Sequence, residues 1–194
     1  LFKATESTDG GERTLTFEFS DGLLSATKTI RSIRGQRSFL VDARVTQNGN
    51  PVPVTVTWGP GFGQPSEEEK SLRGYLAPEV VGVDEAGAET RLPPTALTAR
   101  RTGKFSLLGV ENKYFAAIFS REDGRAVDAI ADIVGQGAEA QVLVFVTPPV
   151  ALTVGAKDYD RLKAIGLGGE KIVPVGSWLG PIVVPLTRAL RAVN

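Results

Sequence analysis

Polar and apolar side chains alternate along the first part of the chain, a pattern typical of strands with one buried face. Residues 14–19 read Thr-Leu-Thr-Phe-Glu-Phe, so their three large apolar side chains share one face. The pair Asp21-Gly22 predicts a turn, and residues 26–33 predict a second strand. The chain is therefore expected to begin with two strands joined by a turn.

A second pair of strands is predicted by residues 39–45 and 52–58, with Asn48-Gly49 as the turn between them. Both segments are rich in Val and Thr, which suit a pleated surface. Two prolines near the start of the second segment cannot donate hydrogen bonds to a neighbouring strand. We therefore expect that segment to begin near the edge of a sheet.

A segment rich in glycine and proline then interrupts the strand pattern. Residues 59–65 read Gly-Pro-Gly-Phe-Gly-Gln-Pro, and three consecutive glutamates follow at Glu67, Glu68 and Glu69. This composition predicts a long exposed loop over residues 59–71. The glutamates lack the spacing of an EF-hand, so they favour a solvated segment over a cation site.

Strand signals resume in the second half of the chain. The predicted strands are residues 80–83, 89–92, 107–119, 126–134 and 140–146. The last is nearly continuous in Val, Leu and Phe, which predicts a strand buried on both faces. Short strands with turn signals about every 8 to 12 residues predict a sandwich of antiparallel sheets. No internal repeat or linker is evident, so the chain is expected to form one domain over residues 1–194.

The large apolar side chains of these strands form the predicted core. They are Leu15, Phe17, Phe19, Tyr114, Phe115, Ile118, Val144 and Phe145. Each lies in a run with strand periodicity. If Phe115 is fully buried, its truncation to alanine should cost about 3–5 kcal/mol.

The C-terminal part, residues 156–194, is predicted to be helical. Asp158 can cap a short helix that runs to Ile165, with Gly166 as its end. Residues 181–193 carry apolar side chains at helical spacing, with Thr and Arg side chains opposite. This second helix is expected either to pack on the sandwich or to lie at a membrane surface.

Composition narrows the classes of function. The chain has 194 residues, 42% of them hydrophobic and 23% charged, as in globular domains. Lys plus Arg and Asp plus Glu each number 22, so the net charge is zero, which argues against nucleic-acid binding. Histidine and cysteine are absent, which excludes Ser-His-Asp and Cys-His nucleophilic sites, thiolate zinc sites and disulfides. No apolar run reaches the roughly 18–20 residues needed to cross a bilayer.

Motifs for chemistry are weak. The Gly103-Lys104 pair lacks the earlier glycine and the adjacent Ser or Thr of a phosphate loop, so residues 101–106 predict a turn beside a strand. The glycines between Gly59 and Gly63 are not followed by a predicted helix that could bind phosphate. A pair of carboxylates acting as in a glycosidase stays open, because the fold rather than sequence distance sets such pairs.

Several segments resemble the large periplasmic domain of YidC, the bacterial membrane protein insertase. Residues 110–119, Val-Glu-Asn-Lys-Tyr-Phe-Ala-Ala-Ile-Phe, are similar to the family's "N-K-Y-F" strand. Residues 152–166, which include Gly-Ala-Lys-Asp-Tyr-Asp-Arg-Leu-Lys, resemble its glycine-proline-lysine segment. Residues 176–180 and 182–186 resemble the glycine-aromatic turn and the proline-leucine start of a helix. The earlier run, residues 13–63, also fits the family's middle strands.

The resemblance implies a super-β-sandwich of antiparallel sheets, similar to galactose-mutarotase folds and closed by short C-terminal α-helices. Mutarotase activity requires histidine, which this chain lacks, so that activity is rejected. The implied location is the periplasmic face of the bacterial inner membrane. The implied partners are the Sec translocon, SecDF and nascent membrane proteins, with no nucleic acid, cofactor or metal.

The leading prediction is a non-catalytic periplasmic domain of a YidC-type insertase, with a docking, scaffold or chaperone-like role. One alternative is a stand-alone carbohydrate- or peptide-binding β-sandwich, which an aromatic platform in a cleft would favour. The other is a carboxylate-based glycan enzyme, which two carboxylates about 5 to 9 Å apart in a pocket would favour. The candidate residues for membrane coupling or interaction are Tyr159, Trp178, Pro185, Leu186, Arg188, Leu190 and Arg191.

Overall fold

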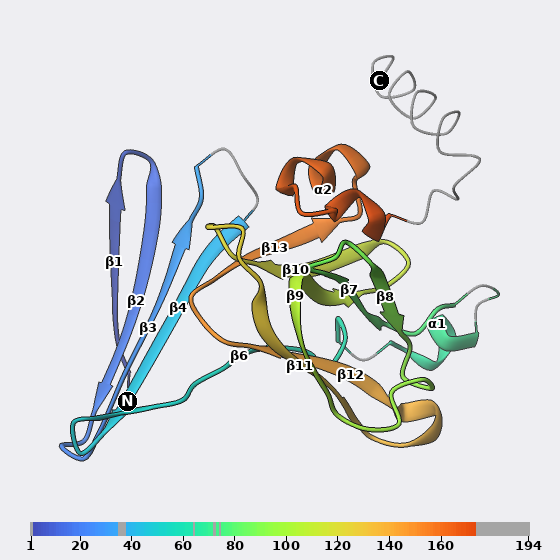
Figure 1. Cartoon of the computed structure of the whole chain (residues 1–194). Helices are drawn as coiled ribbons and strands as arrows, with labels where there is room; N and C mark the ends of the chain where they lie inside the picture. Colours follow the sequence, from blue (N-terminus) through green and yellow to red (C-terminus); the bar gives the residue numbers. More distant parts are fainter. Residues whose placement is uncertain (1, 35–37, 64, 72, 74, 174–194) are drawn as a thin grey trace.

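The computed structural model describes residues 2–34, 38–63, 65–71, 73 and 75–173. Within these residues thirteen strands form one continuous sheet, and all named strand pairs are antiparallel (Figure 1). A short α-helix near the C-terminal end of the described part lies against the sheet. The predicted class, mainly β with antiparallel strands and a short C-terminal helix, is confirmed.

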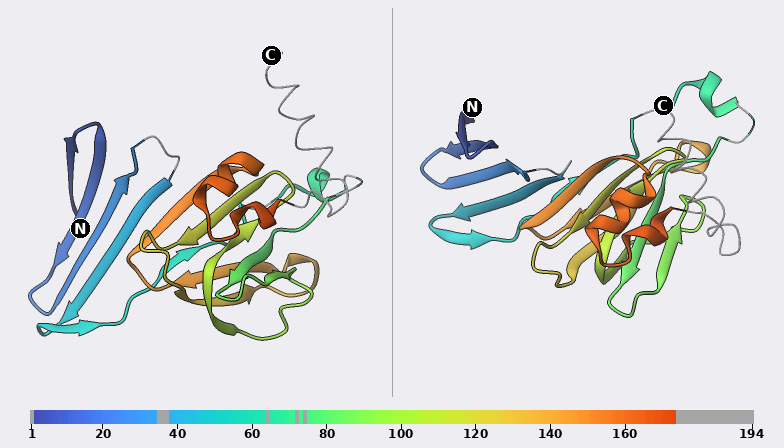
Figure 2. Two further views of the ribbon diagram at one scale, coloured as in Figure 1. Left: turned by 45° about the horizontal axis from the view of Figure 1, so that its top comes forward. Right: turned by 90° about the horizontal axis from the view of Figure 1, so that it is seen from above.

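The first part of the sheet is a run of neighbouring strands at one end of the molecule (Figures 1 and 2). It contains β1 (Lys3–Asp9), β2 (Glu12–Ser20), β3 (Leu24–Ser32), β4 (Ser38–Gln47) and β5 (Asn50–Val52). The Asp21 carboxylate closes the turn between β2 and β3, because its Oδ1 accepts from the backbone N–H groups of Leu23 and Leu24 at 3.0 and 2.7 Å. The two predicted strands and their turn are confirmed.

The strands β1 to β4 have one apolar face and one polar face. The register places Leu15 opposite Ile30, and Ile30 opposite Val41, on one side. The neighbouring positions Thr16 and Thr29 lie opposite each other on the other side. We call the first side the N-terminal apolar face; its apolar members are Leu15, Phe17, Phe19, Ala26, Ile30, Val41, Ala43 and Val45, and Lys28 lies between Phe17 and Ala43 on the same side. No side chain of β1, β2 or β3 is buried, so this face is only partly covered in the described part of the chain.

The predicted strand over residues 52–58 is wrong in one respect. Its residues belong to two strands with different partners: β5 pairs with β4, whereas β6 (Val56–Trp58) pairs with β12. Pro53 lies between them and cannot donate to a ladder, so the chain leaves one part of the sheet and joins another. The predicted loop that follows ends in a short helix, α1 (Glu67–Ser71).

The second half of the chain forms the layered part of the fold. Its elements are β7 (Glu79–Asp84), β8 (Glu89–Leu92), β9 (Arg101–Glu111), β10 (Phe115–Ser120), β11 (Val127–Val134), the 3₁₀ turn η1 (Gly137–Glu139), β12 (Gln141–Val146), β13 (Val150–Ala156), α2 (Tyr159–Ile165) and the 3₁₀ turn η2 (Gly169–Ile172). The first half of β9 pairs with β11 and the second half with β7 and β10. Strand β9 therefore belongs to both layers of the fold: the layer that contains β11 and the layer that contains β7 and β10.

Two sequence predictions are corrected around β9. The single strand predicted over residues 107–119 is a hairpin, because the Asn112 side chain accepts from the backbone N–H groups of Tyr114 and Phe115 at 2.9 and 2.8 Å and turns the chain. Residues 101–106, predicted as a turn, lie inside β9, where residues 101–105 pair with β11. Tertiary pairing overrides the local glycine signal there.

The core consists of two apolar clusters. The larger lies between the layers and includes Val80, Leu108, Phe119 and Val144. The smaller lies on the other face of β7, β9 and β10, where α2 and η2 cover it with Leu162 and Ile172. Strands β7 and β10 are consequently buried on both faces. Strand β12, predicted to be buried on both faces, alternates between buried and half-buried side chains.

The predicted core is only partly correct. Ile118 and Val144 are buried, as predicted, and Phe17, Phe19 and Phe145 are half-buried. Leu15, Tyr114 and Phe115 are wrong: they are exposed at 38%, 63% and 49%. Leu15 lies on the N-terminal apolar face, while Tyr114 and Phe115 lie at the hairpin turn, beyond the covered region. Phe119, four residues along the same strand, is fully buried instead.

No helix among the described residues has both the length and the apolar character needed to cross a bilayer. The prediction of one domain over residues 1–194 stays a prediction. In the predicted helical C-terminal segment, α2 and η2 are described, and the helix expected over residues 181–193 lies outside the described residues.

Candidate functional site

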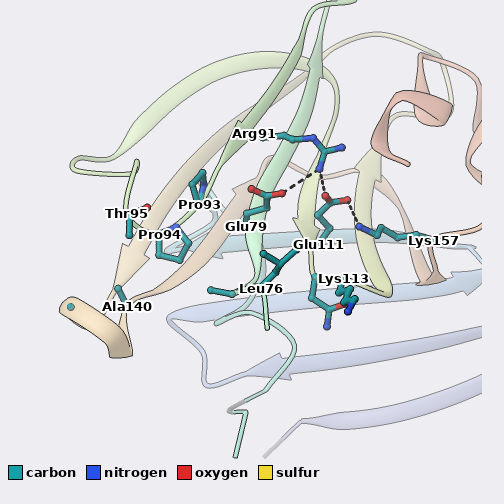
Figure 3. A pocket seen from close by; sticks show the side chains of 13 residues that line it. Leu76, Glu79, Arg91, Pro93, Pro94, Thr95, Glu111, Lys113, Ala140 and Lys157 are labelled. Carbon is teal, nitrogen blue, oxygen red and sulfur yellow. Dashed lines mark hydrogen bonds and ion pairs between the residues drawn. The ribbon is translucent and has the colours of Figure 1, made fainter. Parts of the chain in front are cut away.

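A cluster of charged side chains lies on the face of the sheet that α2 and η2 cover (Figure 3). Glu79 of β7 and Glu111 of β9 are opposite each other in register, and Arg91 of β8 lies on the neighbouring strand. The Arg91 guanidinium bridges the two carboxylates: Nη1 donates to Glu79 Oε1 at 3.2 Å and also to Glu111 Oε1. Its Nε donates to Glu89. One cation therefore compensates three acidic side chains.

Lys157 brings a second cation to Glu111 from the end of β13. The backbone N–H of Lys157 donates to the carbonyl oxygen of Tyr114 at 2.8 Å, which fixes this end of the strand. Its Nζ lies 3.4 Å from Glu111 Oε2. Only 2% of the Glu111 side chain and 9% of the Lys157 side chain are exposed. The pair is thus largely withdrawn from water.

Burial dominates the electrostatics of Glu111. Loss of hydration raises the pKa of its carboxyl above the ordinary value, and the charges of Lys157 and Arg91 oppose that rise without cancelling it. Partial burial lowers the pKa of Arg91, but the charges of Glu111 and Glu89 outweigh it and leave that pKa raised. Glu111 Oε2 is buried without a hydrogen bond. An unsatisfied buried carboxylate oxygen is costly, which makes this atom unusual.

The same cluster attaches the C-terminal helical part to the sheet. Arg91 Nη2 donates to the carbonyl oxygen of Ile172 at 2.9 Å and to that of Lys171 at 3.4 Å. The Lys171 ammonium in turn donates to the carbonyl oxygen of Gly87, in the turn between β7 and β8. Arg91 is therefore bonded to β7, β9 and η2 at once.

A cavity of about 490 Å³ opens beside this cluster (Figure 3). Its charged lining consists of Glu79, Arg91, Glu111, Lys113 and Lys157. The apolar part of its lining is Leu76, Ala77, Pro93, Pro94 and Ala140. No aromatic side chain lines it in the described part of the chain. Its volume is in the range of small-ligand sites.

The arrangement offers binding groups rather than an obvious acid–base pair. Both Glu79 and Glu111 accept hydrogen bonds from the same arginine, so neither carboxylate is held free of a counter-charge. Within the described ranges, no group of three or more His, Cys, Asp or Glu could hold a metal ion.

Of the residues predicted for membrane coupling, the structure describes Tyr159. It begins α2 and is half-buried, with the Lys163 ammonium 6.0 Å from its ring centroid, and it does not line the cavity. The other six lie outside the described residues; they are Trp178, Pro185, Leu186, Arg188, Leu190 and Arg191. The sequence predictions did not include the charged cluster. The one local signal for it is Glu111, a charged residue that ends the apolar run of β9.

Together, fold and site describe a mainly β protein with a buried ion-pair cluster and an adjoining small cavity. No protein-family model matches the chain, and no curated protein matches it either.

Proposed function

We propose that this chain is a periplasmic domain of a YidC-type insertase and assists the insertion and folding of inner-membrane proteins. In this role it is a non-catalytic docking, scaffold or chaperone-like module. The observation that carries the proposal is the structure of residues 152–166, one of the segments that resemble that family. It contains the end of β13 and the helix α2, which begins after the cap residue Asp158, ends at Gly166 and packs against the sheet.

Local interactions define this helical unit. The Asp158 side chain caps α2 by accepting from the backbone N–H of Arg161 at 3.2 Å, and Gly166 ends the helix with a φ of 73°. Leu162 is buried against the sheet. Ion pairing at Lys157 and hydrogen bonding from Arg91 to Ile172 hold the two ends. The several contacts that fix this helical unit to the sheet support a scaffold role.

The proposed partners are the Sec translocon, SecDF and nascent membrane proteins, met at the periplasmic face of the inner membrane. The N-terminal apolar face supports this part of the proposal, since a partly covered apolar sheet is typical of an interaction surface. A zero net charge gives no support to a nucleic-acid partner.

The proposed role involves no catalysis. The sequence has neither histidine nor cysteine, and the cavity carboxylates are ion-paired with Arg91. The alternative of a carbohydrate-binding sandwich gains no support from the cavity, because its described lining carries no aromatic platform. Peptide binding is compatible with both the cavity and the chaperone-like role.

Depletion of the gene product in its own bacterium tests the proposal. Insertion of a multi-spanning reporter protein, scored by protease protection in spheroplasts, should fall as the protein is depleted. Export of a soluble periplasmic reporter serves as the control and should fall less. Unchanged insertion after full depletion would contradict an insertase role.

A further inference from the structure

We propose that the cavity beside Glu111 binds a short, uncharged apolar peptide segment, and that Glu111 and Lys157 hold one of its backbone amides. This inference deepens the proposed function, since it names the part of a client protein that the domain would recognise. It rests on that function only for the identity of the client. The binding chemistry follows from the cavity itself.

The first argument concerns unused hydrogen-bonding groups. Glu111 Oε2 is buried and has no hydrogen bond, although an ammonium lies 3.4 Å away. The Lys157 ammonium has three donors, and its described interaction is the ion pair with Glu111. By contrast, Arg91 donates from Nε, Nη1 and Nη2 to protein oxygens. The wall therefore has one acceptor and spare donors side by side.

A peptide amide matches this pair of groups. Its N–H can donate to Glu111 Oε2, and the carbonyl oxygen of the same or the next peptide unit can accept from Lys157 Nζ. Such binding would satisfy the carboxylate oxygen that otherwise lacks a hydrogen bond. It needs no movement of Arg91, which stays bonded to Glu79 and Ile172.

The aliphatic lining selects the kind of segment. Glu79 and Glu111 are ion-paired with Arg91 and Lys157, so these four side chains carry no net charge between them, and Lys113, which also lines the cavity, adds one positive charge. The opposite lining is aliphatic, with Leu76, two prolines and two alanines. These side chains favour a small aliphatic side chain. A sugar would find no aromatic ring to stack on in the described lining.

The test uses N-acetyl-Leu-Leu-N-methylamide as the probe and the ¹⁵N-labelled 194-residue chain. Titration should shift the amide resonances of Ala77, Lys113 and Ala140, which line the cavity. Lys157→Met should weaken the apparent affinity by about tenfold or more, because it removes a charge-assisted hydrogen bond.

A second variant keeps the test decisive if Lys157→Met disturbs folding. Ala77→Trp fills the cavity without touching an ion pair and should abolish the shifts. Ala86→Trp is the matched control, because Ala86 is exposed in the turn before β8 and does not line the cavity, and it should bind as the original chain does.

Three results would overturn the inference. They are no shifts with the peptide, shifts that persist in Ala77→Trp, and shifts at these residues with methyl glucoside but not with the peptide. All are measured on the isolated chain, so they are independent of the depletion experiment. If the peptide does not bind but insertion falls on depletion, the peptide site is refuted and the insertase role is not. If the peptide binds but insertion is unchanged after depletion, the insertase role is refuted and the peptide site is not.

Discussion

Replacing Arg91 with methionine is expected to lower the free energy of unfolding by about 3–5 kcal/mol. The substitution keeps much of the side-chain length but removes the cation between Glu79 and Glu111. Glu111 then keeps Lys157 as its neighbouring cation in a site where only 2% of its side chain is exposed. The hydrogen bonds to Lys171 and Ile172 disappear as well. Urea denaturation followed by circular dichroism measures the loss.

Arg100→Met is the matched control, because Arg100 pairs with Asp132 at the surface. A surface ion pair contributes at most about 1 kcal/mol, so this variant should change the unfolding free energy little. Equal losses for Arg91→Met and Arg100→Met would show that the cluster does not hold the C-terminal part to the sheet.

Truncation of Phe119 to alanine should be similarly damaging, at about 3–5 kcal/mol. Its side chain is fully buried in the larger core cluster, and alanine would leave a cavity between the layers. Phe115→Ala is the internal comparison on the same strand. Because Phe115 is 49% exposed, its truncation should cost clearly less. Both losses are obtained from the midpoints of urea denaturation, with the same dependence of the unfolding free energy on urea concentration for each variant.

If Phe115→Ala costs as much as Phe119→Ala, the Phe115 side chain is covered in the folded protein, and its exposed position here is wrong. If Phe119→Ala costs under about 1 kcal/mol, the layer arrangement around β10 is wrong.

Local signals in the sequence were sufficient for the elements that depend on neighbouring residues. The alternation over residues 14–19 and the Asp21 turn predicted β2 and its connection to β3. Asp158 and Gly166 predicted both ends of α2, because capping is decided within one helical turn. These features need no knowledge of the rest of the fold.

Features set by tertiary packing were not predictable in the same way. The break between β9 and β10 depends on one asparagine side chain, in an apolar run that otherwise reads as a single strand. Which strands are buried on both faces depends on where α2 lies. The sequence therefore does not show that β7 and β10, rather than β12, are buried on both faces. The size of Phe115 predicts a core position. The sequence does not show that this residue lies at the hairpin turn, where the sheet is not covered.

The charged cluster shows the same limit for the candidate site. Glu79, Arg91, Glu111 and Lys157 are spread over almost 80 positions of the chain. Strand pairing brings the first three together, and β13 delivers the fourth. No local motif marks them as a group, so only the register of the sheet reveals the cluster and its cavity.

The proposed docking through the N-terminal apolar face is tested most directly by photocrosslinking in the intact cell. A photoreactive residue is placed at Leu15, on that face, and in a separate strain at Thr27, which pairs with Glu18 on the opposite, polar face. Both variants are made in the protein as its own cell produces it. We predict adducts from position 15 with subunits of the Sec translocon, with SecDF or with nascent membrane proteins, and far fewer from position 27. Equal yields from both positions, or no adduct with any of these partners from position 15, would contradict the docking role.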